Sequence, residues 1–290
     1  MAPIHRVAVI QWHIKALAVE ENHQKACSYI RNAAAEGAKL AVLPEYHLNG
    51  WAPENPLYAA QASDAARYLA NYQSLARELD ICLVPGTIVE KNTIPEDPGA
   101  DAQAEDVFYN TAYFIAPSGD ILGSYRKKNL WLPERQFLTG SGNDPHQVFD
   151  TPVGRVGMLV CWDIAFPEAF RELVSRGVEL VIVPTFWTKF DSTPQARAFN
   201  PNSEALLLDS TLTTRCFESI CGIVFANAAG PDEQWIGMSR VTMPIAGTVR
   251  SMGDEEGVMV VDVDMGLLGV AEDCYGIRKD LGRKDWHYAW

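Results

Sequence analysis

The sequence predicts an α/β protein in which two similar halves form two sheets within one domain, residues 1–290. Short valine-rich apolar runs indicate strands buried on both faces, and the amphipathic segments between them indicate helices. An internal similarity suggests the halves: EGAKLAVLPE (36–45) resembles RGVELVIVPT (176–185), and RVAVIQ (6–11) resembles RVGMLV (155–160). Helices would then cover the sheets on both sides. The alternative is a chance similarity between apolar strands.

The first half is predicted to alternate between strands and helices. Gly37 is a good terminator for the first helix, and Pro44 ends the strand that follows it. Ser63 is a possible N-cap for a second, alanine-rich helix. We expect strands at 7–11, 39–43 and 81–89, the last interrupted at Pro85-Gly86, and helices at 20–36 and 61–79.

The middle of the chain carries turns and loops. Residues 91–106 are polar and acidic and contain prolines and a glycine, which indicates an exposed loop. Strand-like sequence resumes with VFYNTAYFIAP, and residues 117–120 predict a hairpin turn. Residues 129–150 are irregular, and their Gly140-Ser141-Gly142 does not follow a strand, which argues against a phosphate-binding loop.

The second half repeats the alternation of strands and helices. We expect helices at 167–176 and 203–216 and strands at 156–160, 179–183, 220–226, near 240–250 and at 258–264. The final segment, about 265–290, ends in polar and aromatic residues, and we expect it to pack at a subunit contact.

The composition excludes several classes of partner. The 24 basic and 37 acidic residues give a net charge of −13, which argues against nucleic acid or an anionic membrane. None of the six cysteines forms a C-x-x-C pair, and the six histidines are scattered, so we expect no metal site. No apolar run is long enough to span a bilayer. Without a secretory leader, we expect reduced thiols and a cytoplasmic location.

Cys161 stands at the end of a predicted strand. Residues 156–160 form a short apolar run, and Pro167-Glu168 then opens a helix with proline in its first turn. In open α/β proteins, ligands bind at the carboxyl ends of strands, and a turn there frees N–H groups such as that of Trp162 to bind developing negative charge. A single cysteine is nevertheless more often a small buried hydrophobic residue than a nucleophile.

Two further segments supply groups that could act with this cysteine. Glu45 follows Pro44 at the end of a strand in the related half, and its partly apolar flanks would raise its pKa toward that of a general base. SYRKKNLW (124–131) carries two lysines at the end of a strand, and one ammonium could point inward, favour a thiolate and stabilise an oxyanion. Solvated surface charges are the alternative for both segments.

These three segments resemble the nitrilase superfamily of carbon–nitrogen hydrolases. The family's pattern is a Glu after a strand, a Lys in a YRK-x-H-L type segment and a Cys in a C-W/Y-D…PE segment. LPEYHLNG carries Glu45, CWDIAFPE carries Cys161, and YRKKNLW places the lysine at Lys127. Asn129 stands where the family often has histidine.

The similarity extends over essentially the whole chain. LPERQFLTG matches a segment with a second glutamate, here Glu134, and TRCFESICGIVFANAAG resembles a helix and strand of the family. The resemblance implies an αββα sandwich that pairs into a homodimer or higher homo-oligomer, and a mechanism without cofactor or metal. Glu134 would orient the lysine or bind substrate; a surface glutamate is the alternative.

The implied reaction is hydrolysis of a non-peptide C–N bond through a cysteine thioester. Glu45 would take the thiol proton, Cys161 would attack the substrate carbon, and Lys127 and the N–H of Trp162 would hold the oxyanion. Glu45 would then protonate the leaving ammonia or amine and activate water. A catalytically idle member that only binds a ligand is the alternative.

The substrate is predicted to be a small amide or N-carbamoyl compound. Nitrile-hydrolysing members tend to carry Cys-Trp-Glu, and Asp163 replaces that glutamate here. Ile164 and Ala165 occupy places where carbamoylases for D-amino acids have arginines that hold a carboxylate. A nitrile remains the alternative substrate. We expect an aromatic pocket, with Tyr46, Trp162 and Trp187 binding substrate and Trp51, Phe166 and Phe190 nearby, unless these rings pack the core or a dimer contact.

Overall fold

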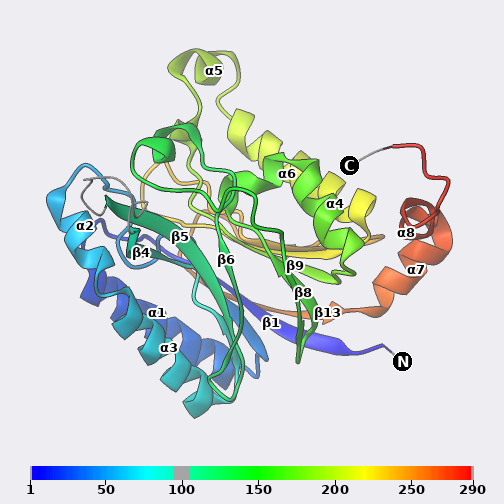
Figure 1. Ribbon diagram of the computed structural model, residues 1–290, viewed down its shortest axis with the longest axis horizontal. Helices are drawn as coiled ribbons and strands as arrows, with labels where there is room; N and C mark the ends of the chain where they lie inside the picture. The colour runs from blue at the N-terminus through cyan, green and yellow to red at the C-terminus, as the bar shows by residue number, and fades with distance from the viewer. Residues whose placement is uncertain (1, 95–104, 289–290) are drawn as a thin grey trace, which may run out of the picture.

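The computed structural model describes residues 2–94 and 105–288, in which two β-sheets pack face to face between layers of helices (Figure 1). The αββα sandwich implied by the resemblance is therefore confirmed. Helices α1 (Val19–Ala35) and α3 (Ala65–Leu79) cover the first sheet, and α4 (Pro167–Ser175) and α6 (Ser203–Ser219) cover the second.

The first sheet has the strand order β13-β1-β2-β3-β5-β4, with β6 paired to β5. It is not built from the first half alone, because β13 pairs antiparallel with β1 from Ile4 opposite Asp264 to Gln11 opposite Gly257. A strand from the second half of the chain therefore completes the first sheet. The strands are β1 (Ile4–Gln11), β2 (Leu40–Val42), β3 (Cys82–Val84), β4 (Thr87–Ile94), β5 (Glu105–Ile115), β6 (Ile121–Arg126) and β13 (Gly257–Asp264).

The second sheet has the strand order β12-β11-β10-β9-β8-β7. Its central strands β8, β9 and β10 are parallel, as are β1, β2 and β3 of the first sheet. The strands are β7 (Val148–Thr151), β8 (Gly154–Met158), β9 (Leu180–Pro184), β10 (Gly222–Ala226), β11 (Arg240–Met243) and β12 (Gly247–Ser251).

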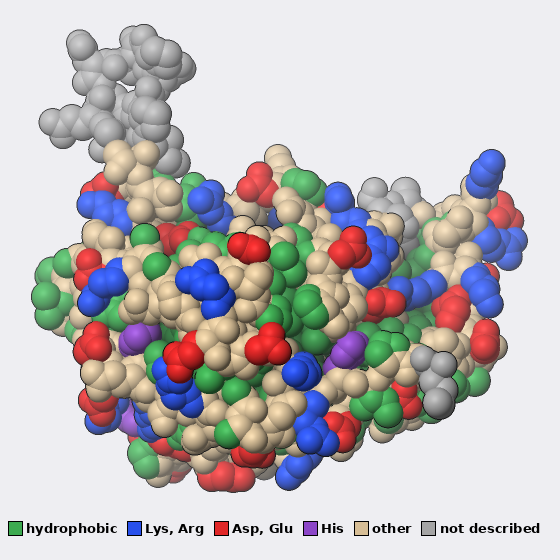
Figure 2. Space-filling view, turned by 90° about the horizontal axis from the view of Figure 1, so that it is seen from below, with side chains coloured by type: hydrophobic (Ala, Val, Ile, Leu, Met, Phe, Trp, Pro, Cys, Tyr) green, Lys and Arg blue, Asp and Glu red, His purple; other side chains and the backbone are tan. Residues whose placement is uncertain are grey.

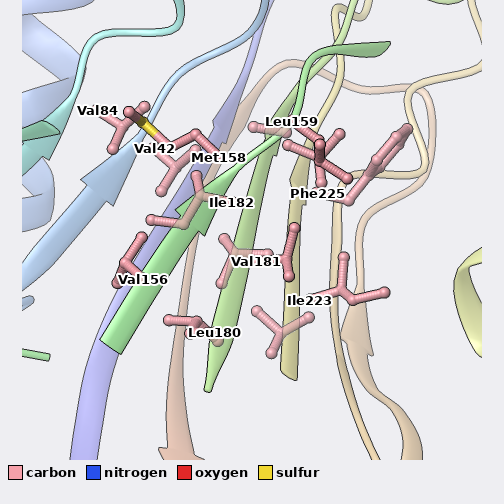
Figure 3. Close-up of a cluster of buried hydrophobic side chains, with 14 of the residues drawn as sticks. Val42, Val84, Val156, Met158, Leu159, Leu180, Val181, Ile182, Ile223 and Phe225 are labelled. Atoms are coloured by element: carbon pink, nitrogen blue, oxygen red, sulfur yellow. The ribbon is translucent and has the colours of Figure 1, made fainter. Parts of the chain in front are cut away.

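The core lies between the two sheets and beneath the helices. Val7 and Val9 of β1 face the second sheet, whereas Ala8 and Ile10 face the layer of α1 and α3, as the two-residue period of a strand requires. Figure 3 shows the side chains between the sheets, with Met158 beside Val42 and Val84 of the first sheet. Strands β1 to β3 and β8 to β10 are apolar on both faces because both faces are buried.

The segment 61–79 contains two helices, so the prediction of a single helix is wrong. Helix α2 (Pro56–Ala62) begins earlier, with proline at its first position and the Asn55 side chain accepting from Leu57 N–H. Ser63 is the C-cap of α2 and not the N-cap of the next helix; Asp64 precedes α3. The sequence does not reveal the break between α2 and α3, because alanine and the other apolar residues are of the same types in both helices.

The segment 81–106 also differs from its prediction. Strands β3 and β4 are not neighbours, because β5 lies between them in the sheet. Gly86 makes the sharp turn between them: its φ is +61°, and a Cβ there would lie 1.8 Å from the carbonyl oxygen of Pro44. Residues 91–94 belong to β4, whose polar composition suits an edge strand. Residues 105 and 106 of the predicted loop belong to β5, and residues 95–104 lie outside the described residues.

The segment after β13 packs partly on its own chain. It forms α7 (Gly266–Tyr275) and α8 (Ile277–Leu281), at the right of Figure 1. The Arg278 side chain donates hydrogen bonds to the carbonyl oxygens of Ser219, at 3.1 Å, and Val178. A subunit contact for this segment stays a prediction.

The surface carries charges of both signs, which are interspersed on the face shown in Figure 2. Within residues 2–94 and 105–288, no helix is long and apolar enough to cross a membrane.

Candidate active site

The carboxyl ends of β2, β8 and β9 meet between the two sheets. Glu45 lies just after β2, and its backbone N–H donates to the carbonyl oxygen of Thr185, just after β9, at 3.2 Å. Tyr46 adopts a positive φ of +53°, which turns the chain away from the strand direction. The sequence therefore brings two strand ends from different sheets into direct contact.

Cys161 occupies a strained turn at the end of the β8 segment. It begins the 3-10 helix η2 (Cys161–Ala165), and its φ is +48°. A non-glycine residue in this region costs about 1–2 kcal/mol, so the surrounding structure has to hold it there. Cys161 and Glu45 line the same cavity.

Lys127 connects two buried carboxylates. It follows β6, and its Nζ lies 2.8 Å from Glu45 Oε1 and 2.7 Å from Glu134 Oε1. Glu134 comes from the 3-10 helix η1 (Leu132–Gln136). The exposed fraction of each of these three side chains is 3% or less, so the ion pairs are shielded from water. Lys127, Glu45 and Glu134 therefore lie in direct contact.

Neighbouring groups complete the hydrogen bonds of the two glutamates. Glu45 also accepts from Asn110 Nδ2, at 2.8 Å, and from the backbone N–H of Phe186, at 3.0 Å. Glu134 also accepts from the hydroxyl of Tyr46 and from the N–H of Trp131, at 2.7 Å. Asn110 is not among the site residues predicted from the sequence, although a single amide inside the apolar and aromatic run VFYNTAYFIAP is a signal that could have identified it.

Asp163 ties the cysteine turn to the lysine segment. Its Oδ1 accepts from both the backbone N–H and the side-chain Nδ2 of Asn129, each at 2.9 Å. Its Oδ2 accepts from the Val160 N–H, at 2.9 Å, and from the Tyr125 hydroxyl, at 2.8 Å. Asn129, which departs from the family's usual histidine, therefore supplies a hydrogen-bond donor that fixes the segment after Lys127.

Burial dominates the electrostatics of the site. It raises the pKa of Glu45 to about 7, against the effect of Lys127. Burial also raises the pKa of Cys161 well above its usual value, and the Glu45 carboxylate adds to this shift. Burial disfavours the charge of Lys127, but Glu45, Cys161 and Glu134 outweigh it and hold the lysine's pKa well above its usual value.

The resting site consequently holds a thiol beside a carboxyl group that titrates near neutral pH. The sequence predicts that the lysine favours a thiolate. Lys127 does act in that direction, but burial and the carboxylates outweigh it. Attack by sulfur therefore requires that the thiol proton passes to Glu45 as the new bond forms.

A cavity of about 180 Å³ opens beside these groups. The predicted pocket residues Tyr46, Trp162 and Trp187 all line it, as does Trp51. Phe166 instead packs on Trp162, with ring centroids 6.1 Å apart, and Phe190 is exposed, with Arg197 above its ring. The remaining lining residues are Glu45, Lys127, Trp131, Glu134, Cys161, Phe186, Asp191, Glu204 and Leu207.

Two of these lining residues, Asp191 and Glu204, were missed by the sequence analysis. They lie in and after the segment 187–203, whose fold is set by tertiary contacts and carried no motif. Among the described residues, no group of three or more His, Cys, Asp and Glu side chains is arranged to hold a metal ion.

Comparisons with known proteins identify the family of the chain. The sequence matches the carbon-nitrogen hydrolase family over residues 6–272. It is 28% identical to the omega-amidase NIT2 of Homo sapiens over 272 residues, 90% of this chain and 88% of that protein. It is also 28% identical to a nitrilase of Pyrococcus abyssi over 270 residues, 91% of each chain.

A solved structure extends the comparison to three dimensions. The structure of a mutant amidase from Nesterenkonia sp. AN1, with acrylamide added at its active-site cysteine, superimposes with a TM-score of 0.68. The two proteins are 26% identical, and the match covers 91% of this chain and 95% of the amidase. With a family match across nearly its whole length and this fold, the chain belongs to the carbon-nitrogen hydrolase family.

Proposed function

We propose that the protein is an amidase that hydrolyses small amides or N-carbamoyl compounds through a thioester on Cys161. The observation that carries the proposal is the meeting of Cys161, Glu45 and Lys127 beside one cavity. Similarity to amidases supports an amide substrate, and Asp163 in place of the glutamate of nitrile-hydrolysing members supports it further.

The first half-reaction forms the thioester. Glu45 accepts the proton of the Cys161 thiol while sulfur attacks the carbonyl carbon, and the carbonyl oxygen becomes an oxyanion. Lys127 Nζ and the backbone N–H of Trp162, which belongs to the first turn of η2, stabilise that oxyanion. When the C–N bond breaks, Glu45 returns the proton to the leaving nitrogen, and ammonia or an amine departs.

The second half-reaction regenerates the thiol. Glu45 accepts a proton from water, whose oxygen attacks the thioester carbon, and the C–S bond breaks with the proton returning to sulfur. A pKa of about 7 suits Glu45 to both directions of proton transfer near neutral pH. Glu134, which is bonded to Lys127 and Tyr46, keeps the ammonium oriented toward the oxyanion.

The assembly and location of the protein are part of the same proposal. Residues 1–290 form one domain, and the chain assembles into a homodimer or higher homo-oligomer, as the family resemblance implies. Six free cysteines support a reducing compartment such as the cytoplasm. Light scattering of the purified protein at micromolar concentration tests the assembly; a monomer there would contradict it.

The test of the function is a substrate panel with a covalent probe. Ammonia or amine release is measured over aliphatic amides, aromatic amides, carbamoyl amines and nitriles, and we expect turnover of an amide or a carbamoyl compound. Acrylamide, which adds to the active-site cysteine of a mutant Nesterenkonia amidase, should modify Cys161 first. Turnover of nitriles alone would contradict the amidase proposal. If no compound is turned over and Cys161 is not preferentially labelled, the protein is a ligand-binding member of the family without activity.

A further inference from the structure

Two carboxylates that the mechanism does not use face the cavity. Asp191, in the 3-10 helix η3 (Lys189–Asp191), and Glu204, in the first turn of α6, line it together with Cys161. In the described part of the chain, neither forms an ion pair with a basic side chain. Lys127 is the only basic residue among the lining residues that the structure describes, and Glu45 and Glu134 already bind it.

The local contacts of these carboxylates do not require their charge. Asp191 accepts hydrogen bonds from the N–H and the hydroxyl of Thr188, at 2.9 and 2.8 Å, and so closes the turn of η3. Glu204 accepts from Trp187 Nε1 at 2.7 Å. At position 204, a glutamine oxygen could accept the same bond. At position 191, an asparagine oxygen could accept from the Thr188 N–H, and its Nδ2 could donate to the Thr188 hydroxyl, which is also an acceptor. The turn and the indole contact therefore explain an oxygen at each position but not a negative charge.

The charge of Asp191 is also costly at its position. Burial raises the pKa of Asp191 to about 6, and the neighbouring Glu204 adds to the shift. Two carboxylates that repel each other beside a cavity form a site of negative potential, which a cation in the cavity would relieve. A substrate carboxylate would be repelled from the same place.

Two indole rings line the same cavity as these carboxylates. The rings of Trp162 and Trp187, which both line the cavity, lie 5.5 Å apart between centroids. Indole faces attract alkylammonium ions, and carboxylates accept hydrogen bonds from their N–H groups. The wall thus combines the two kinds of group that bind a primary ammonium.

We propose that Asp191 and Glu204 form a subsite for a cationic end of the substrate. The enzyme then acts on an aliphatic amide or N-carbamoyl compound that bears a primary ammonium at the end away from the scissile bond. The substrate is small: a cavity of about 150 Å³ holds benzene, so one of about 180 Å³ suits roughly six to ten non-hydrogen atoms. This inference rests on the proposed amidase function and specifies its substrate class.

Three amides of nearly equal size test the subsite by turnover. δ-Aminovaleramide carries the ammonium, hexanamide replaces it with a methyl group, and the monoamide of glutaric acid carries a carboxylate. We expect kcat/KM for δ-aminovaleramide to exceed that for hexanamide at least tenfold, with the monoamide last. An equal or reversed order would overturn the inference while leaving the amidase function in place.

Variants locate the effect. Glu204→Gln and Asp191→Asn remove the charge but can still hydrogen-bond Trp187 and Thr188, and each should lower the ratio of kcat/KM for δ-aminovaleramide over hexanamide at least fivefold. Glu204→Lys should move the preference toward the monoamide. The matched control is Glu36→Gln, an exposed carboxylate at the end of α1, which should leave the ratio unchanged. A preference for the ammonium substrate that survives both neutral variants would overturn the assignment to these residues.

A binding measurement separates the subsite from the chemistry. Pentylammonium, pentanol and valerate are compared as protectants of Cys161 against iodoacetamide, and the modified cysteine is identified by mass spectrometry. Protection by pentylammonium at a concentration at least tenfold below that needed for pentanol, and its weakening by Glu204→Gln, would support the subsite even if no amide were hydrolysed. Equal protection by all three would overturn it.

Discussion

The unit β1–α1–β2 and the unit β8–α4–β9 are built from the same local pieces. Each helix ends at a glycine with positive φ, Gly37 at +81° and Gly177 at +78°. The strand that follows then begins with the same kind of hydrogen bond: the N–H of residue 39 donates to the carbonyl of residue 6 at 2.7 Å, and that of residue 179 to residue 155 at 2.8 Å.

The register of the parallel strands is also the same. Val7 lies opposite Leu40 in the first unit, and Val156 lies opposite Leu180 in the second. These are the positions that the sequence similarity aligns. The internal similarity therefore reflects two equivalent structural units and not a chance likeness of apolar strands.

The two units differ where their strands end. In the first, β1 continues to Gln11, whose Nε2 donates to two carbonyl oxygens near the β12–β13 turn and whose Oε1 accepts from Ser239 N–H at 3.1 Å. In the second, β8 ends at Met158, and the chain turns sharply at Cys161. One strand end joins the sheets, whereas the other presents a thiol to a cavity.

The other pair of strand ends differs in the same way. After β2 and β9, Pro44 is followed by Glu45 and Pro184 by Thr185, and these two equivalent residues are joined by the backbone bond from Glu45 N–H to the Thr185 carbonyl. The first unit thus contributes the carboxylate and the second the sulfur. Repeating one scaffold places two different groups face to face, and neither unit contains the site alone.

Removing the sulfur should have the largest effect on activity. Cys161→Ala should lower kcat at least about 10⁴-fold, because no other group can form the thioester. The melting temperature should change little, since only one atom that borders a cavity is lost. Cys221→Ala is the control: it removes a buried thiol outside the cavity and should keep kcat within about threefold. Substantial turnover by Cys161→Ala would contradict the mechanism.

Neutralising the carboxylate of the first unit should have the next largest effect. Glu45→Gln should lower kcat/KM about 10²- to 10⁴-fold, because the amide cannot accept the thiol proton. In the unmodified enzyme, kcat/KM should rise with pH as Glu45 loses its proton, with a midpoint near its pKa of about 7. That rise should disappear in the residual activity of Glu45→Gln.

The equivalent residue of the second unit provides the control for this prediction. Thr185→Val changes a buried side chain at the position that matches Glu45, and the carbonyl that accepts from Glu45 N–H is retained. We expect kcat/KM within about threefold of the unmodified enzyme and the same dependence on pH. If Thr185→Val lowered kcat/KM as much as Glu45→Gln, the packing of the strand ends and not the carboxylate would explain the loss of activity.

Much of this architecture could be predicted from the sequence because its signals are local. Valine runs, helix-ending glycines and strand-ending prolines located most elements of both units, and the same signals placed Glu45 and Cys161 at strand ends. The pairing of β13 with β1 could not be predicted, since the choice of partner strand depends on contacts between distant segments. Asn110, Asp191 and Glu204 were missed for the same reason: their importance comes from neighbours brought by the fold.

Removing a hydrogen bond that supports the cysteine turn should have a smaller effect on activity. Asn129→Ala removes one of the hydrogen bonds to Asp163, so the free energy of unfolding should fall by about 1–2 kcal/mol and kcat several-fold. Asn129→His, the residue common in the family, offers a donor again and should recover most of both losses. Chemical denaturation and kcat of the two variants check this. If histidine restored neither quantity, a hydrogen-bond donor would not be what position 129 provides.

The smallest effect on activity is expected at the two glycines, where the units are most alike. Gly37→Ala and Gly177→Ala each force a side chain into the left-handed region, and each should cost about 1–2 kcal/mol of unfolding free energy. An added Cβ would lie 3.7 Å from Nη1 of Arg6 in the first case and 2.3 Å from Nη1 of Arg155 in the second, but the latter is the end of a flexible, exposed side chain that can move. The two losses should therefore agree within about 1 kcal/mol, with kcat unchanged in both, because backbone strain and not location sets the cost. A much larger loss at one glycine would mean that the two units, although built alike, do not bear equally on the stability of the fold.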